Sequence, residues 1–318
     1  MNFQQLRIIR ETVRRDFNLT DVANALFTSQ SGVSRHIRDL EDELGVELYV
    51  RKGKRLLGLT EPGQQMLKIV ERMLLDAGNL RNLADQYSQQ DTGQLTIVTT
   101  HTQARYVLPA VVTRFRQQFP AVHLRLHQGS PGEIARMLQQ GEADIALATE
   151  ALAEVEQLAT FPLYQWRHAV VVPSGHPLAC QVLEQGQPLS LEAIAEYPII
   201  TYHEGFTGRG RIEQAFRDAG VTPDIVMSAL DADVIKSYVE LGLGIGIIAS
   251  VAFSPERDTG LRLLSVEHLF PLNETKLALR RGHLLRQYAY RFIEMCSPQL
   301  HEEYVSQVLV DGAADDAG

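Results

Sequence analysis

The segment from Thr28 to Gly45, TSQSGVSRHIRDLEDELG, spaces its serines and arginines so that a helix would gather them on one face. Its apolar residues recur every three or four positions, which predicts an α-helix with a buried stripe. The stripe is Val33, Ile37, Leu40 and Leu44, and the exposed face carries Ser31, Ser34, Arg35 and Arg38. The acids that follow, Asp39, Glu41, Asp42 and Glu43, would point away from a bound phosphate. Hydroxyl and guanidinium donors on one helix face can contact the base edges of duplex DNA. For this helix taken alone, the alternative to DNA contact is a polar face that contacts only solvent.

A basic segment after this helix favours the DNA interpretation. Residues 46–60 have the pattern of two short strands joined through Gly53, which predicts a β-hairpin. Its bases are Arg51, Lys52, Lys54 and Arg55. Residues 1–60 hold ten basic and eight acidic side chains, although the whole chain has a net charge of −9. Upstream, Thr20 can cap a short helix that a tight turn joins to the arginine-bearing one. These elements predict a winged helix-turn-helix that enters the major groove.

Hydroxyl side chains also collect where predicted strands end and helices begin. In TTHTQARY the strand ends near Thr100, and a helix with free backbone N–H groups begins just after it. Such donors can hold a carboxylate or sulfate, and Arg209 could add positive charge. For each hydroxyl by itself, a helix cap is the alternative role. The candidate ligand contacts are Thr100, Thr102, Gln103, Ser130, Thr149, Thr201, Tyr202, Phe206 and Thr207. His101 can be a spacer between them, and Asp231 and Asp233 are expected to cap a helix rather than bind metal.

An α/β scaffold is needed to position these hydroxyls. Strand patterns occur at 95–100, 122–128, 143–149, 168–173, 198–202, 224–230, 245–249 and 276–280. Helical patterns occur at 104–118, 131–140, 191–196, 209–219, 233–241 and 284–296. The alternation predicts an α/β fold with largely parallel sheets. We expect the acidic end of the chain, DGAADDAG, to be disordered.

Residues 61–90 predict one long helix that Thr60 caps. Its apolar residues alternate steps of four and three, which makes a heptad seam. The seam is Met66, Val70, Met73, Ala77, Leu80, Ala84 and Tyr87. It predicts a coiled-coil dimer that presents two recognition helices to a palindromic site. Packing of this helix on its own domain is the alternative.

Several other classes of protein lack support in the sequence. The first residues hold no uninterrupted apolar run of the signal-peptide kind, and nowhere do eighteen apolar residues follow one another, so we expect a cytoplasmic protein without membrane segments. Cys180 and Cys296 lie far apart in the sequence and do not have the spacing of a zinc site or a disulfide framework, so we expect both to be small buried hydrophobic residues. The segment GLGIGII follows a helix and enters a strand, the reverse of a dinucleotide site, so its glycines are expected to serve close packing. We find no catalytic or metal-binding motif, and we expect no cofactor besides a small effector.

The residues 19–63, LTDVANALFTSQSGVSRHIRDLEDELGVELYVRKGKRLLGLTEPG, resemble the winged helix-turn-helix of LysR-type transcriptional regulators. The segments TTHTQARY, ADIALATEAL, GFTGR and DADVIKSYVELGLGIGIIA resemble the CysB/Cbl subgroup of that family. The resemblance implies a winged helix-turn-helix domain (1–60), a long linker and dimerisation helix (61–90), a periplasmic-binding-protein-like effector domain (91–300) and a C-terminal tail (301–318). The effector domain would have two α/β subdomains, about 91–162 with 269–300 and about 163–268. The chain would cross between them twice and leave a cleft for an effector.

The resemblance also implies a function. It implies a homodimer or homotetramer that binds double-stranded promoter DNA, works with RNA polymerase and controls genes of sulfur assimilation or sulfonate use. It matches Gln30, Ser31, Ser34 and Arg35 to base or backbone contacts, and the hairpin bases to phosphate contacts. The effector would be an acetylserine-type inducer, sulfate, thiosulfate or adenosine phosphosulfate.

The sequence leaves several points open. Many relatives have Pro where this chain has Ser31, so the base preference is open. The effector, the operator, the sign of regulation and the choice between a CysB and a Cbl role are open as well. The alternatives from other classes are a binding protein or enzyme of the same α/β fold, and an architectural DNA-binding protein.

Overall fold

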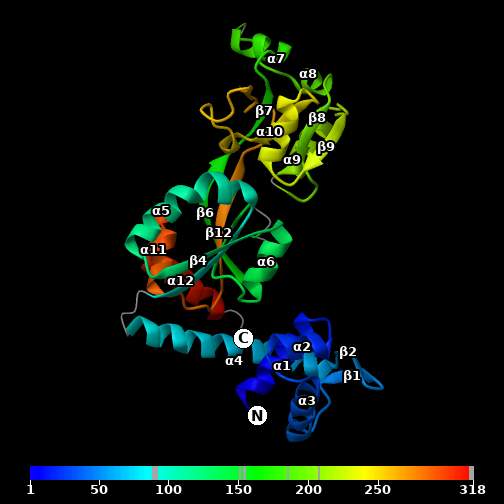
Figure 1. Cartoon of the computed structure of the whole chain (residues 1–318), viewed down its shortest axis with the longest axis vertical. Helices are drawn as coiled ribbons and strands as arrows, with labels where there is room; N and C mark the ends of the chain where they lie inside the picture. The colour runs from blue at the N-terminus through cyan, green and yellow to red at the C-terminus, as the bar shows by residue number, and fades with distance from the viewer. Residues whose placement is uncertain (88–91, 150–151, 153–154, 185, 207, 315–318) are drawn as a thin grey trace. The chain divides into compact units, whose positions relative to one another are not determined.

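The computed structural model describes residues 1–318 except 88–91, 150–151, 153–154, 185, 207 and 315–318 (Figure 1). The chain divides into two compact units, residues 1–89 and 90–318. None of the described helices combines the length and apolar content needed to span a bilayer.

The N-terminal unit is a winged helix-turn-helix followed by a long helix, as predicted. Its elements are α1 (Phe3–Arg14), α2 (Leu19–Ala25), α3 (Gln30–Leu44), β1 (Tyr49–Lys52), β2 (Arg55–Leu59) and α4 (Glu61–Tyr87). Strands β1 and β2 form an antiparallel hairpin that turns at Gly53, where φ is +62°. Residues from all three N-terminal helices and the hairpin share one apolar core with the first half of α4.

The ends of the first helices differ in detail from the prediction. Ser29 caps α3, because its hydroxyl accepts a hydrogen bond from the Gly32 N–H at 3.1 Å. The predicted cap of α2 at Thr20 is wrong: the cap is Asn18, two residues earlier, and its side chain accepts from the N–H groups of Thr20 and Asp21. Leu44 was expected in the buried stripe but is 39% exposed, since it lies in the last turn before the chain reverses at Gly45.

The predicted heptad seam of α4 divides into two halves with different environments. Met66, Val70 and Met73 pack into the core of their own unit, which is the alternative role considered for the seam. Further along the helix, Leu80 and Tyr87 are 70% and 83% exposed. The second half therefore presents an apolar surface that this unit does not cover.

The C-terminal unit contains two five-stranded sheets, each the centre of one subdomain (Figure 1). In subdomain I the strand order is β4-β3-β5-β12-β6. These strands are β3 (Gly93–Thr99), β4 (Val122–Gln128), β5 (Ile145–Ala148), β6 (Leu158–Trp166) and β12 (Asn273–Arg280). The helices of this subdomain are η1 (Gln103–Val107), α5 (Leu108–Gln118), α6 (Pro131–Gln139), α11 (Gln287–Cys296) and α12 (Glu302–Ala314).

Subdomain II has the strand order β11-β7-β10-β8-β9. Its strands are β7 (His168–Pro173), β8 (Ile199–Tyr202), β9 (Ile225–Ala229), β10 (Ile245–Ala249) and β11 (Leu261–Ser265). Its helices are α7 (Pro177–Ala179), η3 (Cys180–Glu184), α8 (Leu191–Ala195), α9 (Arg209–Asp218), α10 (Ala232–Glu240) and η4 (Ser250–Ala252). Gly244 and Gly246 of the GLGIGII segment serve close packing as predicted, because an added Cβ would lie 2.4 Å from the Pro198 carbonyl oxygen and 2.5 Å from a Val171 methyl group. The prediction is wrong for Gly242, which has no atom within 4 Å of an added Cβ and instead supplies a φ of +78°.

The chain crosses between the subdomains twice, from β6 to β7 and from β11 to β12. The crossings correct the expectation of largely parallel sheets: β12 runs antiparallel to β5 and β6, and β7 antiparallel to β10 and β11. A strand that leaves a sheet and the strand that returns to it necessarily run in opposite directions. Because β6 extends to Trp166 and β12 begins at Asn273, the subdomain borders also lie a few residues beyond 162 and 269.

Of the segment DGAADDAG that was expected to be disordered, residues 311–314 form the end of a helix, and residues 315–318 lie outside the described residues. Helix α12 extends to Ala314, and Val305 and Leu309 are buried in the core of subdomain I. Burying two aliphatic side chains stabilises this helix by about 3–6 kcal/mol before its ordering entropy is subtracted. Residues 302–314 therefore belong to subdomain I.

Candidate DNA-binding and effector sites

Helix α3, the predicted recognition helix, presents the predicted donors to solvent. Gln30, Ser31, Arg35 and Arg38 are exposed, and Ser34 is half-buried. Two of these donors are already engaged within the helix: the Ser31 hydroxyl lies 3.1 Å from that of Ser29, and Arg38 Nε donates to the Ser34 carbonyl at 3.3 Å. In the described part of the chain, Arg35 has no hydrogen bond or ion pair. Its guanidinium group can reach a base edge without breaking an existing contact.

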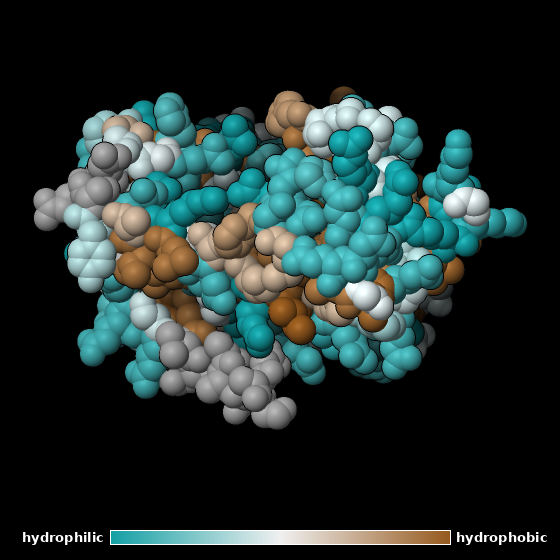
Figure 2. Space-filling view, turned by 90° about the horizontal axis from the view of Figure 1, so that it is seen from below, coloured by the Kyte–Doolittle hydropathy of each residue, from teal (hydrophilic) through white to brown (hydrophobic). Residues whose placement is uncertain are grey.

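The hairpin separates its four bases into two roles. Lys52, Lys54 and Arg55 are exposed on the hairpin. Hydrophilic side chains cover this part of the N-terminal unit, at the right of Figure 2. Arg51 instead forms an ion pair with Glu41, whose carboxylate is buried and accepts a 2.8 Å hydrogen bond from the Leu48 N–H. Arg51 therefore neutralises the buried Glu41 carboxylate.

Two threonines of the predicted anion site follow neighbouring strands of subdomain I. Strands β3 and β5 are parallel, with Thr99 opposite Leu147, so Thr100 and Thr149 emerge at the same edge of the sheet. Both residues are about 95% buried. In the described part of the chain, neither hydroxyl hydrogen-bonds to another residue. Thr99, one residue earlier, differs because its hydroxyl donates to the Leu147 carbonyl at 2.8 Å.

A buried polar cluster holds the next predicted residues in place. Gln103 donates to the Thr275 hydroxyl at 3.2 Å and accepts from the Tyr164 hydroxyl. The indole N–H of Trp166 donates to the same Thr275 oxygen at 3.2 Å. Strands β6 and β12 carry these partners, so the sheet edge fixes the orientation of the Gln103 amide.

The residues predicted from subdomain II are largely occupied by structural contacts. The Thr201 hydroxyl donates to the Ile247 carbonyl at 2.9 Å. Burial raises the pKa of Tyr202, and hydrogen bonds from the Ala249 N–H and from Thr102 partly offset this. Phe206 and, from subdomain I, Tyr106 are half-buried and pack against the apolar cluster that contains Tyr202. Thr102, Tyr202 and Phe206 are thus brought together across the two subdomains.

Two further candidates meet local partners. The Ser130 hydroxyl caps α6 and contacts the Glu133 carboxylate at 2.9 Å, so an anion there would meet a negative charge. Arg209 is buried and pairs with Glu213, and it donates to the Tyr202 carbonyl at 2.6 Å, so its charge is already balanced. Thr207 lies outside the described residues.

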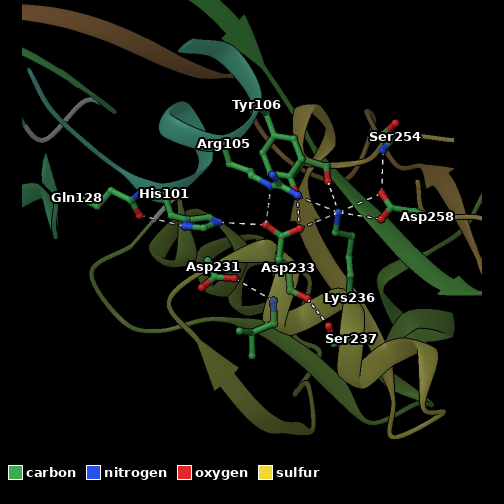
Figure 3. A network of polar contacts seen from close by, with 12 residues as sticks. His101, Arg105, Tyr106, Gln128, Asp231, Asp233, Lys236, Ser237, Ser254 and Asp258 are labelled. Atoms are coloured by element: carbon green, nitrogen blue, oxygen red, sulfur yellow. Dashed lines mark hydrogen bonds and ion pairs between the residues drawn. The ribbon is translucent and has the colours of Figure 1, made fainter. Parts of the chain in front are cut away.

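One network of charged residues was missed by sequence reasoning (Figure 3). Asp233 on α10 accepts a 2.7 Å hydrogen bond from the Tyr106 hydroxyl and lies 3.1 Å from His101 Nε2. Lys236 donates to the Tyr106 hydroxyl at 2.9 Å and to both oxygens of Asp258 at 3.0 Å. His101 is therefore not a spacer. The only local signal was the spacing of Asp233 and Lys236 on one helix face, which does not reveal contacts with residues more than a hundred positions away.

Asp231 caps α10 as predicted, through the Val234 N–H at 2.9 Å, whereas Asp233 does not cap it. His101, Asp231 and Asp233 lie close enough to share a metal ion, with ligand atoms within 4.8 Å of one another. Both oxygens of Asp233 already have cationic or hydroxyl neighbours, since Lys236 lies at 3.4 Å and Arg105 at 3.6 Å. These two cations compete with any metal ion for the carboxylate.

Comparison with known proteins identifies both units. Residues 3–64 match the family model of bacterial regulatory helix-turn-helix proteins of the lysR family, and residues 88–300 match the LysR substrate binding domain. The chain is 57% identical to the HTH-type transcriptional regulator SsuR of Burkholderia cenocepacia, over 97% of this chain and 99% of that one. It is 53% identical to the regulator Cbl of Escherichia coli, over 99% and 98%. A crystal structure of the cofactor-binding domain of the Cbl transcriptional regulator matches with a TM-score of 0.63 and 50% identity, and covers 69% of this chain and 94% of that one.

Proposed function

Because the chain belongs to the LysR family of bacterial transcriptional regulators, we propose that it binds promoter DNA through α3 and the hairpin and responds to a small anion held by subdomain I. The relatives are regulators of the kind named SsuR, Cbl and CysB, and the chain is accordingly a transcriptional regulator rather than an enzyme. We further propose that it acts in the cytoplasm as a homodimer or homotetramer and contacts RNA polymerase.

The effector part of the proposal is carried by the pair Thr100 and Thr149, two buried residues whose hydroxyls have no hydrogen-bond partner among the described residues. Two neutral donors at strand ends can hydrogen-bond to an anion without leaving a buried charge behind when the site is empty. Gln103, whose amide is held beside Thr100 by Thr275 and Tyr164, is a further donor, whereas the Thr102 hydroxyl already donates to Tyr202.

The chemistry of these donors fits a sulfur-containing anion. We propose that the effector is an acetylserine-type inducer, sulfate, thiosulfate or adenosine phosphosulfate, and that the controlled genes serve sulfur assimilation or sulfonate use. Each of these compounds presents anionic oxygens to hydroxyl and amide donors, so the donors alone do not choose between them.

Thermal-shift measurements on the full chain with each of the four compounds test the effector. We expect at least one to raise the melting temperature in proportion to its occupancy, relative to an equal concentration of chloride. Thr100→Val and Thr149→Val should weaken that binding about ten- to hundredfold, since each removes a hydrogen bond to a charged ligand. Thr99→Val is the matched control, because its hydroxyl is satisfied by Leu147. Equal binding by all three variants would place the site elsewhere.

Removing the wing bases tests the DNA part against the alternative of a binding protein that does not regulate genes. We expect the variant with Lys52, Lys54 and Arg55 changed to Ala to lose most of its affinity for DNA, because phosphate contacts dominate that affinity. Arg51 is kept, since it neutralises Glu41. If the triple variant binds DNA as tightly as the native chain, the proposed interface is wrong.

A further inference from the structure

The polar network of Figure 3 joins the two subdomains at the candidate effector site. Asp233 belongs to α10 of subdomain II, and its partners Tyr106, His101 and Arg105 all belong to residues 101–106 of subdomain I. That short segment also carries Thr102 and Gln103, two of the candidate effector contacts. One carboxylate therefore contacts three side chains of the segment that forms one wall of the site.

Lys236 keeps this carboxylate and its main donor in place. It is buried, lies 3.4 Å from Asp233 and donates to the Tyr106 hydroxyl at 2.9 Å. On its other side it donates to both oxygens of Asp258 and to the Ala252 carbonyl at 2.8 Å. The Asp258 carboxylate is in turn held by the Ser254 N–H at 2.8 Å. The position of Asp233 is thus set by an anchored chain of contacts within subdomain II.

Stability alone does not explain such an arrangement. A buried ion pair stabilises a fold no better than apolar residues of similar volume, whereas it fixes the direction of each donor. Burial would raise the pKa of Asp233, but hydrogen bonds from Tyr106 and His101 and the charge of Lys236 lower it below the usual range. The carboxylate is therefore charged at neutral pH and attracts all three side chains of residues 101–106.

We propose that Asp233 is a positioning residue for the effector site: it bridges α10 to residues 101–106 and thereby holds Thr102 and Gln103 where an effector meets them. The importance of this bridge for ligand binding rests on the function proposed above. Its mechanical role, which is to hold residues 101–106 against subdomain II, does not depend on that function. When the subdomains separate, Asp233 loses its three partners together, and the segment loses its support from subdomain II.

Hydrogen exchange in the effector-free full chain tests the mechanical role. We expect Asp233→Asn to speed amide exchange in residues 100–107 about tenfold, because a charge-assisted hydrogen bond is lost, while exchange in β10 stays as in the native chain. Asp231→Asn is the matched control: it removes the same charge two positions away, and Asn caps a helix as well as Asp does. Equal exchange in the two variants, or faster exchange throughout subdomain II, would overturn the proposal.

A double-mutant cycle gives a second, independent reading. Tyr106→Phe removes the hydroxyl that contacts both Asp233 and Lys236. If the bridge acts as one unit, the effects of Tyr106→Phe and Asp233→Asn on exchange in residues 100–107 are not additive, and the double variant is little worse than either single one. Additive effects would mean that the two residues act separately, which contradicts a bridge.

Titration with sulfate, thiosulfate, O-acetylserine and adenosine phosphosulfate then separates this inference from the proposed function. We expect Asp233→Asn to bind whichever of these compounds the native chain binds about tenfold more weakly, with Asp231→Asn unchanged. Binding of none of the four by the native chain would count against the proposed effector, and the exchange measurements would still decide the bridge. Native-like affinity in Asp233→Asn would overturn its positioning role for the ligand.

Discussion

The two units of the chain use charge in opposite ways. On the N-terminal unit, Arg35 and Lys54 are exposed and available to a partner. In the C-terminal unit, the buried cations Arg209 and Lys236 are each paired with a carboxylate of the same subdomain, Glu213 and Asp258. The candidate effector donors of that unit, Thr100 and Thr149, are neutral hydroxyls at strand ends.

The difference fits the ligands proposed for the two units. A cation in water loses little when no DNA is present, and it gains affinity by releasing counterions when it reaches a phosphate. A cation in a closed site without its ligand would be a buried, unpaired charge, which is strongly destabilising. In the absence of its ligand, an exposed surface can therefore keep charged donors, whereas a buried site is stable only with neutral donors.

The exposed apolar half of α4 is an exception to the charged surface of the N-terminal unit, and it gives the largest expected effect. Leu80→Asp should abolish dimerisation through this helix, because two charges would be buried in one seam, and DNA affinity should fall more than a hundredfold. Sedimentation velocity measures the assembly. Gln65→Asp adds the same charge on the same helix outside the seam and should remain a dimer. An unchanged assembly with Leu80→Asp would mean that Leu80 does not contact a second chain.

His283 tests whether burial in the C-terminal unit disfavours a charge at a position outside the candidate effector site. Burial and the nearby Arg280 lower the pKa of His283 to about 4. As the pH falls below 6.5, His283 takes up a proton in the unfolded chain but stays neutral in the folded chain until about pH 4. The free energy of unfolding is therefore highest above pH 6.5 and decreases between pH 6.5 and 4. The loss amounts to about 3 kcal/mol at pH 4. Urea unfolding followed by the fluorescence of Trp166, the single Trp of the chain, reports this unit.

The variant His283→Gln should flatten that pH dependence, since it removes the titrating group. His203 is exposed, and His203→Gln should leave the dependence as it is. An equally steep loss of stability in His283→Gln would show that other groups cause it.

The same contrast between the units explains what could be predicted from sequence. Helix α3 and the hairpin were predicted because their signals are local: apolar periodicity in the helix and a turn at Gly53 between the two strands. Strand β6 was not predicted, because Pro162 interrupts the strand pattern of its sequence. That residue lies at a bulge in an edge strand, where the missing N–H is tolerated.

The candidate effector site was predicted only in part for a related physical reason. The strand-end position of Thr100 and Thr149 follows from parallel pairing, which the alternating pattern indicates. The sequence does not show that Thr201 is satisfied by Ile247, or that Asp233 reaches Tyr106 across more than a hundred residues. Those contacts depend on tertiary packing, so no short window of residues contains them.

Arg35 sharpens the comparison on the DNA side. Arg35→Ala should cost about 1–3 kcal/mol of discrimination between an operator selected from a random pool and unrelated DNA, if its free guanidinium reads a base edge. Fluorescence anisotropy with both DNAs measures the ratio. Arg38→Ala is the control with an internally engaged side chain and should lose less discrimination. An equal loss of affinity for both DNAs in Arg35→Ala would reassign Arg35 to the backbone.

Lys54 gives the smallest effect and the clearest contrast with a base-reading residue. Lys54→Ala should weaken binding to operator and unrelated DNA by the same factor and reduce the slope of log affinity against log salt by about 1, because one phosphate contact is lost. The folded state should be unaffected, since the side chain is exposed at the turn of the hairpin.

Arg51→Ala is expected to behave differently from Lys54→Ala, although the two residues lie only three positions apart. It leaves the buried Glu41 carboxylate without its cation and so lowers the stability of the N-terminal unit. Anisotropy titrations at several salt concentrations, together with thermal unfolding, separate the two. A sequence-dependent loss in Lys54→Ala, or native stability in Arg51→Ala, would break the division between exposed and paired charge on the hairpin.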